Sequence, residues 1–160
     1  MTVRKPLVVV NGQIQQLQSG DSIEVSGSSS IQLDVTNNQG TTINICQAVY
    51  LDAADSVKLA KADAASTKGF FGLVGDATIA SGSSGTIYVE GVLTATTTQW
   101  DAVTGDTGGL TAGDVYYLDP STAGKITKTA STTTGQYVVR VGRAINTTDM
   151  EIDHNLSILL

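Results

Sequence analysis

The sequence predicts an all-β fold, a small β-barrel or a β-clip-like domain built from two related halves. Three observations support this prediction. Apolar residues occur in short runs that alternate with polar residues or are rich in valine and isoleucine, as in strands. Turn-forming residues separate these runs, among them 17 glycines in a chain of 160 residues. A stretch in the first half of the chain also recurs in the second half.

The recurring stretch is carried by Tyr50-Leu51-Asp52, which returns as Tyr117-Leu118-Asp119, 117 − 50 = 67 residues later. At this constant offset, residues 48–77 and 115–144 are predicted to be two copies of one unit. Two copies are too few for a solenoid, which needs about three or more. We therefore expect one domain built from two related halves.

Residues 1–45 are expected to form an N-terminal β segment or arm. Leu7-Val8-Val9-Val10 is an apolar run that ends in the turn dipeptide Asn11-Gly12. A strand of this kind has no polar face and is covered on both sides, either by its own domain or by another chain. Residues 30–36 and 41–46 flank a cluster of turn residues, and their alternation predicts a β-hairpin.

Residues 46–160 are expected to form the β domain. Its strands are predicted from apolar runs bounded by turns, in chain order at residues 48–51, 57–61, 70–74, 86–90, 115–118, 125–128, 137–142 and 150–153. Gly91 is expected to interrupt the fourth of these strands. In the second copy Arg140 takes the place of Leu73, a difference between the halves that marks a place to look for function.

One short helical turn is predicted near residues 97–104. Thr96 and Gln99 have the spacing of a capping box, and Gly105 suits the position that follows a helix. Trp100 is expected to anchor this turn on the barrel.

The chain ends in Leu156-Ser157-Ile158-Leu159-Leu160, which is apolar to its last residue. An exposed apolar terminus favours association, so we expect a strand that is paired in the domain or at a subunit contact. The residues predicted to contact a partner are Leu7, Val8, Val9, Val10, Leu156, Ile158, Leu159 and Leu160.

Composition disfavours several classes of function. The net charge is −6 and the isoelectric point about 4.4, whereas binding to nucleic-acid phosphates requires clustered Lys and Arg. No run approaches the ~18 apolar residues of a membrane span, and the start is too short in apolar residues for a signal peptide. We therefore expect no nucleic-acid or membrane partner, and synthesis in a cytoplasm.

The sequence predicts no catalytic, cofactor or metal site. Its single histidine is His154 and its single cysteine is Cys46, which lies in an apolar run and is expected to be a buried small hydrophobe. Zinc requires a Cys/His cluster that one chain of this composition cannot supply. The aspartates lack the ligand spacing of a calcium loop. We expect a protein that is not an enzyme.

Several blocks of the chain resemble a module of tailed-phage virion proteins. They run from Gln47 to Ala77, from Gly91 to Asp101, from Gly109 to Leu118 and from Gly135 to Gly142. The opening from Lys5 to Leu17 also resembles the start of phage fibre-type proteins. Such modules occur in head decoration (cement) proteins and at the ends of fibres.

This resemblance implies a non-enzymatic, β-rich structural protein of the virion, assembled as a homo-oligomer, a trimer by analogy. The expected function is capsid decoration, in which the protein binds the outside of the assembled head and bridges subunits of the major capsid protein. The alternative is a tail or head fibre, or a receptor-binding module, which would bind host glycans through exposed aromatic residues such as Tyr88, Trp100 or Tyr116.

Overall fold

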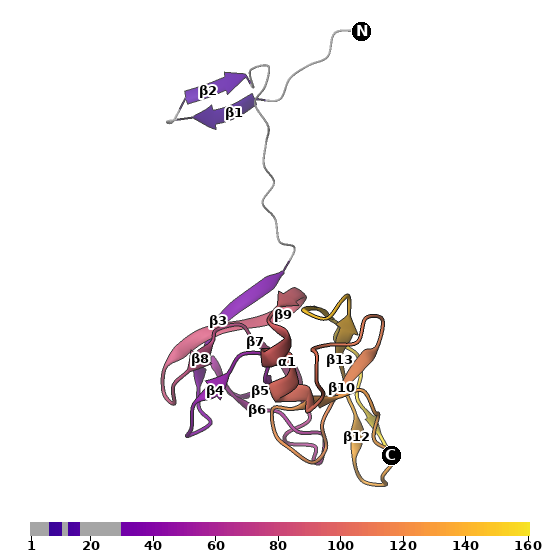
Figure 1. The fold of residues 1–160 in the computed structure, drawn as a ribbon. Helices are drawn as coiled ribbons and strands as arrows, with labels where there is room; N and C mark the ends of the chain where they lie inside the picture. Colours follow the sequence, from indigo (N-terminus) through magenta and orange to yellow (C-terminus); the bar gives the residue numbers. More distant parts are fainter. Residues whose placement is uncertain (1–6, 11–12, 17–29) are drawn as a thin grey trace.

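The computed structural model describes residues 7–10, 13–16 and 30–160 (Figure 1). Its elements, in chain order, are β1 (Leu7–Val10), β2 (Gln13–Gln16), β3 (Ile31–Asn37), β4 (Ile43–Asn44), β5 (Ala48–Ala53), β6 (Ser56–Leu59), β7 (Phe70–Val74), β8 (Thr78–Ile79), β9 (Ser84–Thr94), α1 (Thr97–Thr104), β10 (Val115–Leu118), β11 (Ile126–Thr127), β12 (Tyr137–Val138), β13 (Arg140–Ala144), β14 (Asp149–Ile152) and β15 (Ile158–Leu159). The predicted all-β character is thus confirmed for the described part of the chain.

Five strands close into a mixed β-barrel in the order β9-β3-β6-β5-β7, and β7 pairs back onto β9. β3 and β6 are parallel, and the other neighbours are antiparallel. Gly72 allows β7 and β9 to approach closely, because a Cβ there would lie 2.7 Å from Cγ2 of Ile87. One cluster of buried side chains, which we call the barrel core, combines residues of the barrel strands with Ile43 and Ile79 of the β4–β8 pair. The barrel strands contribute Val35, Val49, Val57, Val74 and Ile87.

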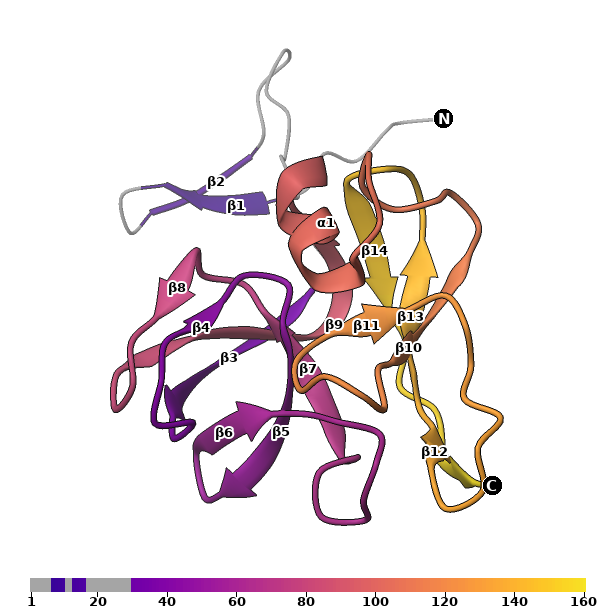
Figure 2. The same ribbon diagram turned by 60° about the horizontal axis from the view of Figure 1, so that its bottom comes forward.

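The long strand β9 connects the barrel to the rest of the domain. Its second half leaves the barrel and pairs with β14, and the sheet continues through β13 and β10 to β11. In Figure 2 these orange and yellow strands lie beside the barrel, next to α1. The strand does not end at Gly91 as the sequence predicted, because Gly91 adopts a φ of +92° and remains paired with Ile152.

A second and larger group of buried side chains, the main core, lies outside the barrel core. It includes Leu73 from the barrel wall, Trp100 from α1, and Tyr116 and Met150 from the second part of the sheet, all at most 2% exposed. Trp100 Nε1 also donates a hydrogen bond to the carbonyl of Thr148, at 2.8 Å. Trp100 thus anchors the helix as predicted, but its side chain lies in the main core and not in the barrel core.

Helix α1 forms where the sequence predicted it. Thr96 is the N-cap and accepts the N–H of Gln99, while the Gln99 side chain accepts the N–H of Thr96 in return. Gly105 closes the helix in the left-handed conformation with φ +74°.

The predicted hairpin between residues 30–36 and 41–46 is wrong. β3 pairs with β9 and β6, whereas β4 pairs with β8. The buried side chain of Asn37 organises the intervening turn, because it donates to the carbonyls of Thr41 and Ile79 and accepts the N–H of Gln39. β3 and β4 therefore both contribute to the barrel region.

The predicted repeat stays a prediction. The β5–β7 and β10–β13 pairs each carry a register shift, but Val49 is paired with Gly72 and Tyr116 with Gly142. Equivalent positions in β5 and β10 are thus 116 − 49 = 67 residues apart, whereas equivalent positions in their partners β7 and β13 are 142 − 72 = 70 residues apart. In this register Arg140 takes the place of Phe70 and not of Leu73, since each is paired with the tyrosine of its half.

Candidate interaction surface

The predicted C-terminal contact segment forms an exposed apolar surface. β15 pairs antiparallel with β12, with Val138 opposite Ile158 and Tyr137 opposite Leu159. The segment is therefore a paired strand of the domain, but its side chains remain outside. Four of these side chains form what we call the C-terminal surface: Leu156, Ile158, Leu159 and Leu160, which are 93%, 61%, 60% and 38% exposed.

Several contacts fix this segment on the domain. Leu160 exchanges backbone hydrogen bonds with Gly135 and Gln136, at 2.9 and 3.0 Å. Lys68 Nζ donates to the hydroxyl of Ser157 at 2.6 Å and lies 4.9 Å from the ring centre of Tyr137. The apolar side chains are thus presented from an anchored strand, which lowers the conformational entropy lost on binding.

A hollow of about 460 Å³ adjoins the C-terminal surface. It is lined by Tyr117, Val138, Arg140, Asn155, Leu156 and Ile158. Arg140 Nη2 lies 2.8 Å from the carboxylate of Asp153, while its buried Nε has no hydrogen-bond partner among the described residues. Arg140, marked by the sequence as a difference between the halves, therefore lies beside the predicted contact residues.

The predicted N-terminal contact residues Leu7–Val10 form β1, which pairs with β2. Val10 lies opposite Gln13, and Leu7 lies opposite Gln16. The side chains of these two strands lie outside the described residues. Among the described strands, this hairpin pairs only with itself.

A second apolar surface lies at one end of the barrel and was not predicted. Ile31 and Leu33 at the start of β3 are 51% and 47% exposed, and Leu51 near the end of β5 is 49% exposed. The alternation of Ile31, Leu33 and Val35 predicted a half-buried strand, but only Val35 reaches the barrel core. No local sequence signal distinguishes the exposed from the buried members of this pattern.

The reactive side chains have structural partners. His154 Nε2 lies 2.7 Å from the carbonyl of Val89, and its ring stacks on Phe70 with 5.0 Å between ring centres. Cys46 is fully buried, as predicted, and burial raises the pKa of its thiol to about 12. His154 lines a hollow of about 210 Å³ together with Lys68 and Ser157, whereas Cys46 is enclosed in the main core.

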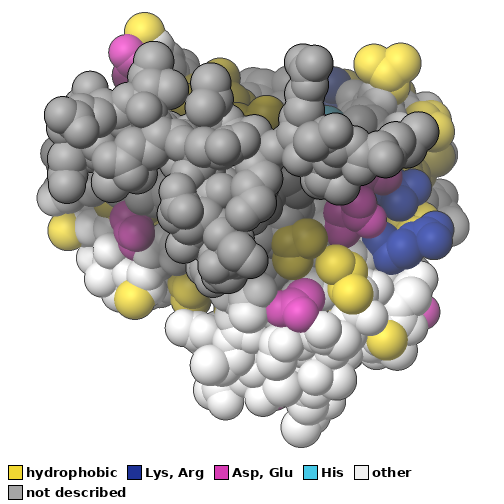
Figure 3. Space-filling model, turned by 90° about the horizontal axis from the view of Figure 1, so that it is seen from above, with side chains coloured by type: hydrophobic (Ala, Val, Ile, Leu, Met, Phe, Trp, Pro, Cys, Tyr) yellow, Lys and Arg dark blue, Asp and Glu magenta, His cyan; other side chains and the backbone are white. Residues whose placement is uncertain are grey.

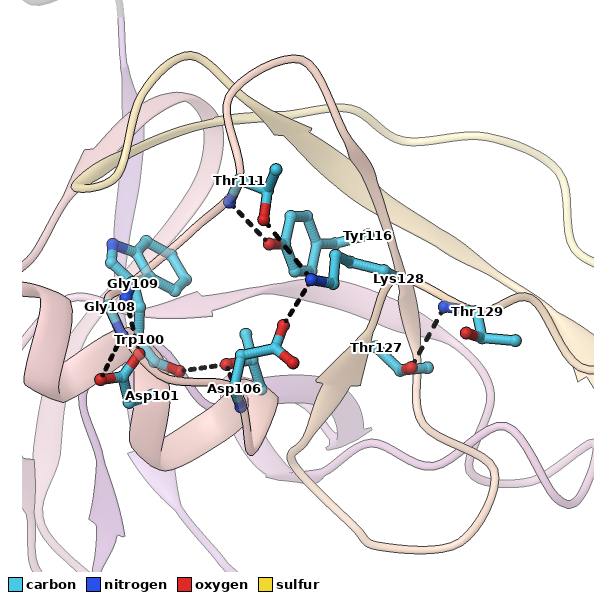
Figure 4. Close-up of polar contacts among 11 residues, drawn as sticks. Trp100, Asp101, Asp106, Gly108, Gly109, Thr111, Tyr116, Thr127, Lys128 and Thr129 are labelled. Atoms are coloured by element: carbon cyan, nitrogen blue, oxygen red, sulfur yellow. Dashed lines mark hydrogen bonds and ion pairs between the residues drawn. The ribbon is translucent and has the colours of Figure 1, made fainter.

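The acidic side chains are held by local contacts. Figure 4 shows Asp101 accepting the N–H groups of Gly108 and Gly109, and Asp106 paired with Lys128 at 3.0 Å. A hydrogen bond from Lys58, supported by one from Asn38, lowers the pKa of Asp52. Within residues 30–160 and the two short N-terminal strands, no three His, Cys, Asp or Glu side chains gather to hold a metal ion.

The aromatic residues that a glycan-binding module would expose are largely inside. Trp100 and Tyr116 are both 0% exposed, and the Tyr116 hydroxyl accepts the N–H of Thr111 at 3.0 Å. The exposure of these two residues that the fibre alternative requires is therefore not found. Tyr88 is partly buried against the main core.

Within the described ranges, no helix has the length and apolar character needed to cross a membrane. No protein family and no curated protein matches the sequence of this chain.

Proposed function

We propose that the protein is a structural component of a tailed-phage virion that decorates the outside of the assembled head and bridges subunits of the major capsid protein. The proposal includes a homo-oligomer, a trimer by analogy, with no enzymatic activity and no cofactor. The resemblance of the sequence to phage virion modules supplies the class of protein. The C-terminal surface supplies the feature that suits this role.

The observation that carries the proposal is the exposure of four apolar side chains on one anchored strand segment. Leu156, with 93% of its surface exposed, and Ile158, with 61%, lie beside the hollow at Arg140. Exposed apolar groups of this kind mark binding surfaces in soluble proteins. Removing apolar surface from water contributes about 25 cal/mol per Å², so burying these side chains against the coat supports adhesion.

The backbone of the same segment offers a second mode of contact. β15 pairs with β12 on one edge, and no strand in the described part of the chain pairs with its other edge. A strand of a coat subunit would add to this edge by backbone hydrogen bonds, while pockets for its side chains give specificity. Many weak contacts on one shell would then add by avidity.

The test is binding to heads that lack the protein, prepared from the phage that encodes it. Wild-type protein is expected to co-sediment with these heads and to saturate at hundreds of copies per head. The double variant Leu156→Asp/Ile158→Asp is expected to bind at least tenfold more weakly, because a buried, unpaired carboxylate opposes contact. Ile145→Asp is the matched control, since Ile145 is 51% exposed in another loop and its substitution leaves binding unchanged.

The outcome also separates decoration from a fibre role. Binding to host cells without binding to heads, or a few copies at a vertex or tail in electron micrographs of the virion, would replace decoration by the fibre function. Trp100 and Tyr116 are buried, so of the three aromatic residues named for the fibre role only the partly buried Tyr88 could contact a glycan.

A further inference from the structure

The end of the barrel at which β3 begins is lined by apolar side chains that are exposed or only partly buried. β3 and β7 begin at this end of the barrel. β5 ends at the same end, because it runs antiparallel to β7, and β7 has the same direction as β3 since both are antiparallel to β9. By the alternation of strands, Leu33 and Leu51 lie on the same side as the barrel-core residues two positions away, Val35 and Val49. Phe71 packs partly against the same core. We call Leu33, Leu51 and Phe71, together with the exposed Ile31 at the start of β3, the barrel mouth.

The backbone beside the barrel mouth also has an open edge. β3 pairs with β9 from Ile31 to Thr36, but with β6 only at its last two residues, Thr36 and Asn37. Thr36 donates its N–H to Asp55 on the β6 side. The N–H groups of Gln32 and Asp34 point to that same edge, where no described strand pairs with them.

The N-terminal hairpin is a segment that requires such an edge. An isolated two-stranded hairpin is at best marginally stable in water, and β1 consists of Leu-Val-Val-Val, which has no polar face. In the structure of one chain, β1 and β2 pair with no strand of the barrel. Thirteen residues, 17–29, separate β2 from Ser30, and a chain of that length spans at most about 45 Å.

The charges of the two parts are complementary. Residues 1–16 carry Arg4 and Lys5 and no acidic residue. Acidic residues surround the barrel mouth, with Asp34, Asp55 and Glu90 exposed on β3, on the turn before β6 and on β9. In Figure 3, seen from the end where β3 begins, acidic side chains in magenta lie among apolar side chains in yellow where grey atoms do not cover them.

We propose that the hairpin β1–β2 of a second copy of this chain docks on the barrel mouth, with one of its strands added to the open edge of β3. The occupant is a second copy because the hairpin does not pair with the barrel of its own chain. The exchange covers Leu33 and Leu51 and gives the open edge of β3 a partner strand. This inference rests on the homo-oligomer of the proposed function, but its tests use the isolated protein and can fail or succeed separately from head binding.

The first test is self-association of the full chain, measured by sedimentation equilibrium over a range of concentrations. The wild-type protein is expected to form a dimer or higher oligomer. Leu33→Asp is expected to weaken association at least tenfold. Ile145→Asp is the control and is expected to leave association unchanged, since Ile145 is 51% exposed and Leu33 is 47% exposed. A wild-type protein that stays monomeric, or equal effects of both substitutions, would overturn the proposal.

The second test identifies the occupant by cross-linking. Full-length Val9→Cys chains and Leu33→Cys chains are mixed and treated with a short bis-maleimide reagent. Cys46 gives little background, because it is fully buried. A heterodimer of the two chains is expected, well above that of Val9→Cys mixed with Ile145→Cys. Equal yields in both mixtures, or cross-linking only within single chains of a Val9→Cys/Leu33→Cys double variant, would contradict docking by a second copy.

Discussion

Cys46 shows how strongly the interior acts on a single side chain. It is 0% exposed, belongs to the main core and has a φ of +66°, which is rare for a residue other than glycine. The surrounding strands hold it there, since its N–H donates to the carbonyl of Val74 at 2.9 Å. Burial penalises the thiolate and raises the pKa of the thiol from 9.0 to about 12.

This raised pKa predicts a loss of stability at high pH. Below pH 9 the thiol is neutral in both the folded and the unfolded state, and its titration has no effect. Between pH 9 and 12 only the unfolded chain ionises, so the unfolded state gains stability. From pH 7 to pH 10, the free energy of unfolding of wild type is expected to fall by about 1.4 kcal/mol more than that of Cys46→Ala.

Urea titrations of both proteins at the two pH values measure this difference. The variant is the control for every effect of pH on stability that does not involve Cys46. A difference between the two proteins that does not change with pH would show that the Cys46 thiol ionises equally in both states.

At the scale of the element, α1 depends on its cap. The first N–H groups of a helix have no partner within the helix, and Thr96 satisfies one of them by accepting the N–H of Gln99. Thr96→Ala is expected to lower the free energy of unfolding by about 1 kcal/mol. Thr98→Ala, at an exposed position within the same helix, is expected to change it by less than about half of that amount. Thermal unfolding of the two variants makes the comparison, and equal losses would contradict a role of the cap.

The helix was predictable because its signals are local. Thr96, Gln99 and Gly105 act within nine residues of one another, and each contact is made inside that window. Most strands were also located, since apolar runs and turn residues mark where a strand begins and ends. The pairing of the strands was not predictable from the sequence. β3 pairs with β9, with Ile31 opposite Glu90 and Thr36 opposite Ser84, so the two strands are separated by a long stretch of chain.

The candidate surfaces show the same division. The apolar C-terminal run was visible in the sequence, and its strand is exposed in the structure. The barrel mouth was not visible, because Leu33 and Val35 have the same pattern but only Val35 lies beneath neighbouring strands. Exposure there depends on where β6 begins relative to β3, which is a property of the assembled barrel.

At the scale of the whole molecule, β9 contributes side chains to both cores. Ile87 belongs to the barrel core, whereas Leu93, six residues later on the same strand, belongs to the main core. Leu73 on β7 likewise faces the main core from the barrel wall. We therefore expect that a cavity in the barrel core also destabilises the region around Trp100, which is the single tryptophan of the chain.

This coupling predicts that Ile87→Ala destabilises both cores together. Ile87 is 0% exposed, and removing its side chain leaves a cavity that costs about 2–5 kcal/mol. Trp100 fluorescence and far-ultraviolet circular dichroism are expected to give coincident urea transitions, both shifted to lower urea by the same amount. Met150→Ala, which makes its cavity in the main core, is expected to move both signals in the same way. If the fluorescence transition of Ile87→Ala stayed at the wild-type midpoint while the dichroism transition moved, the barrel would unfold separately, and β9 would be a hinge between two independent units.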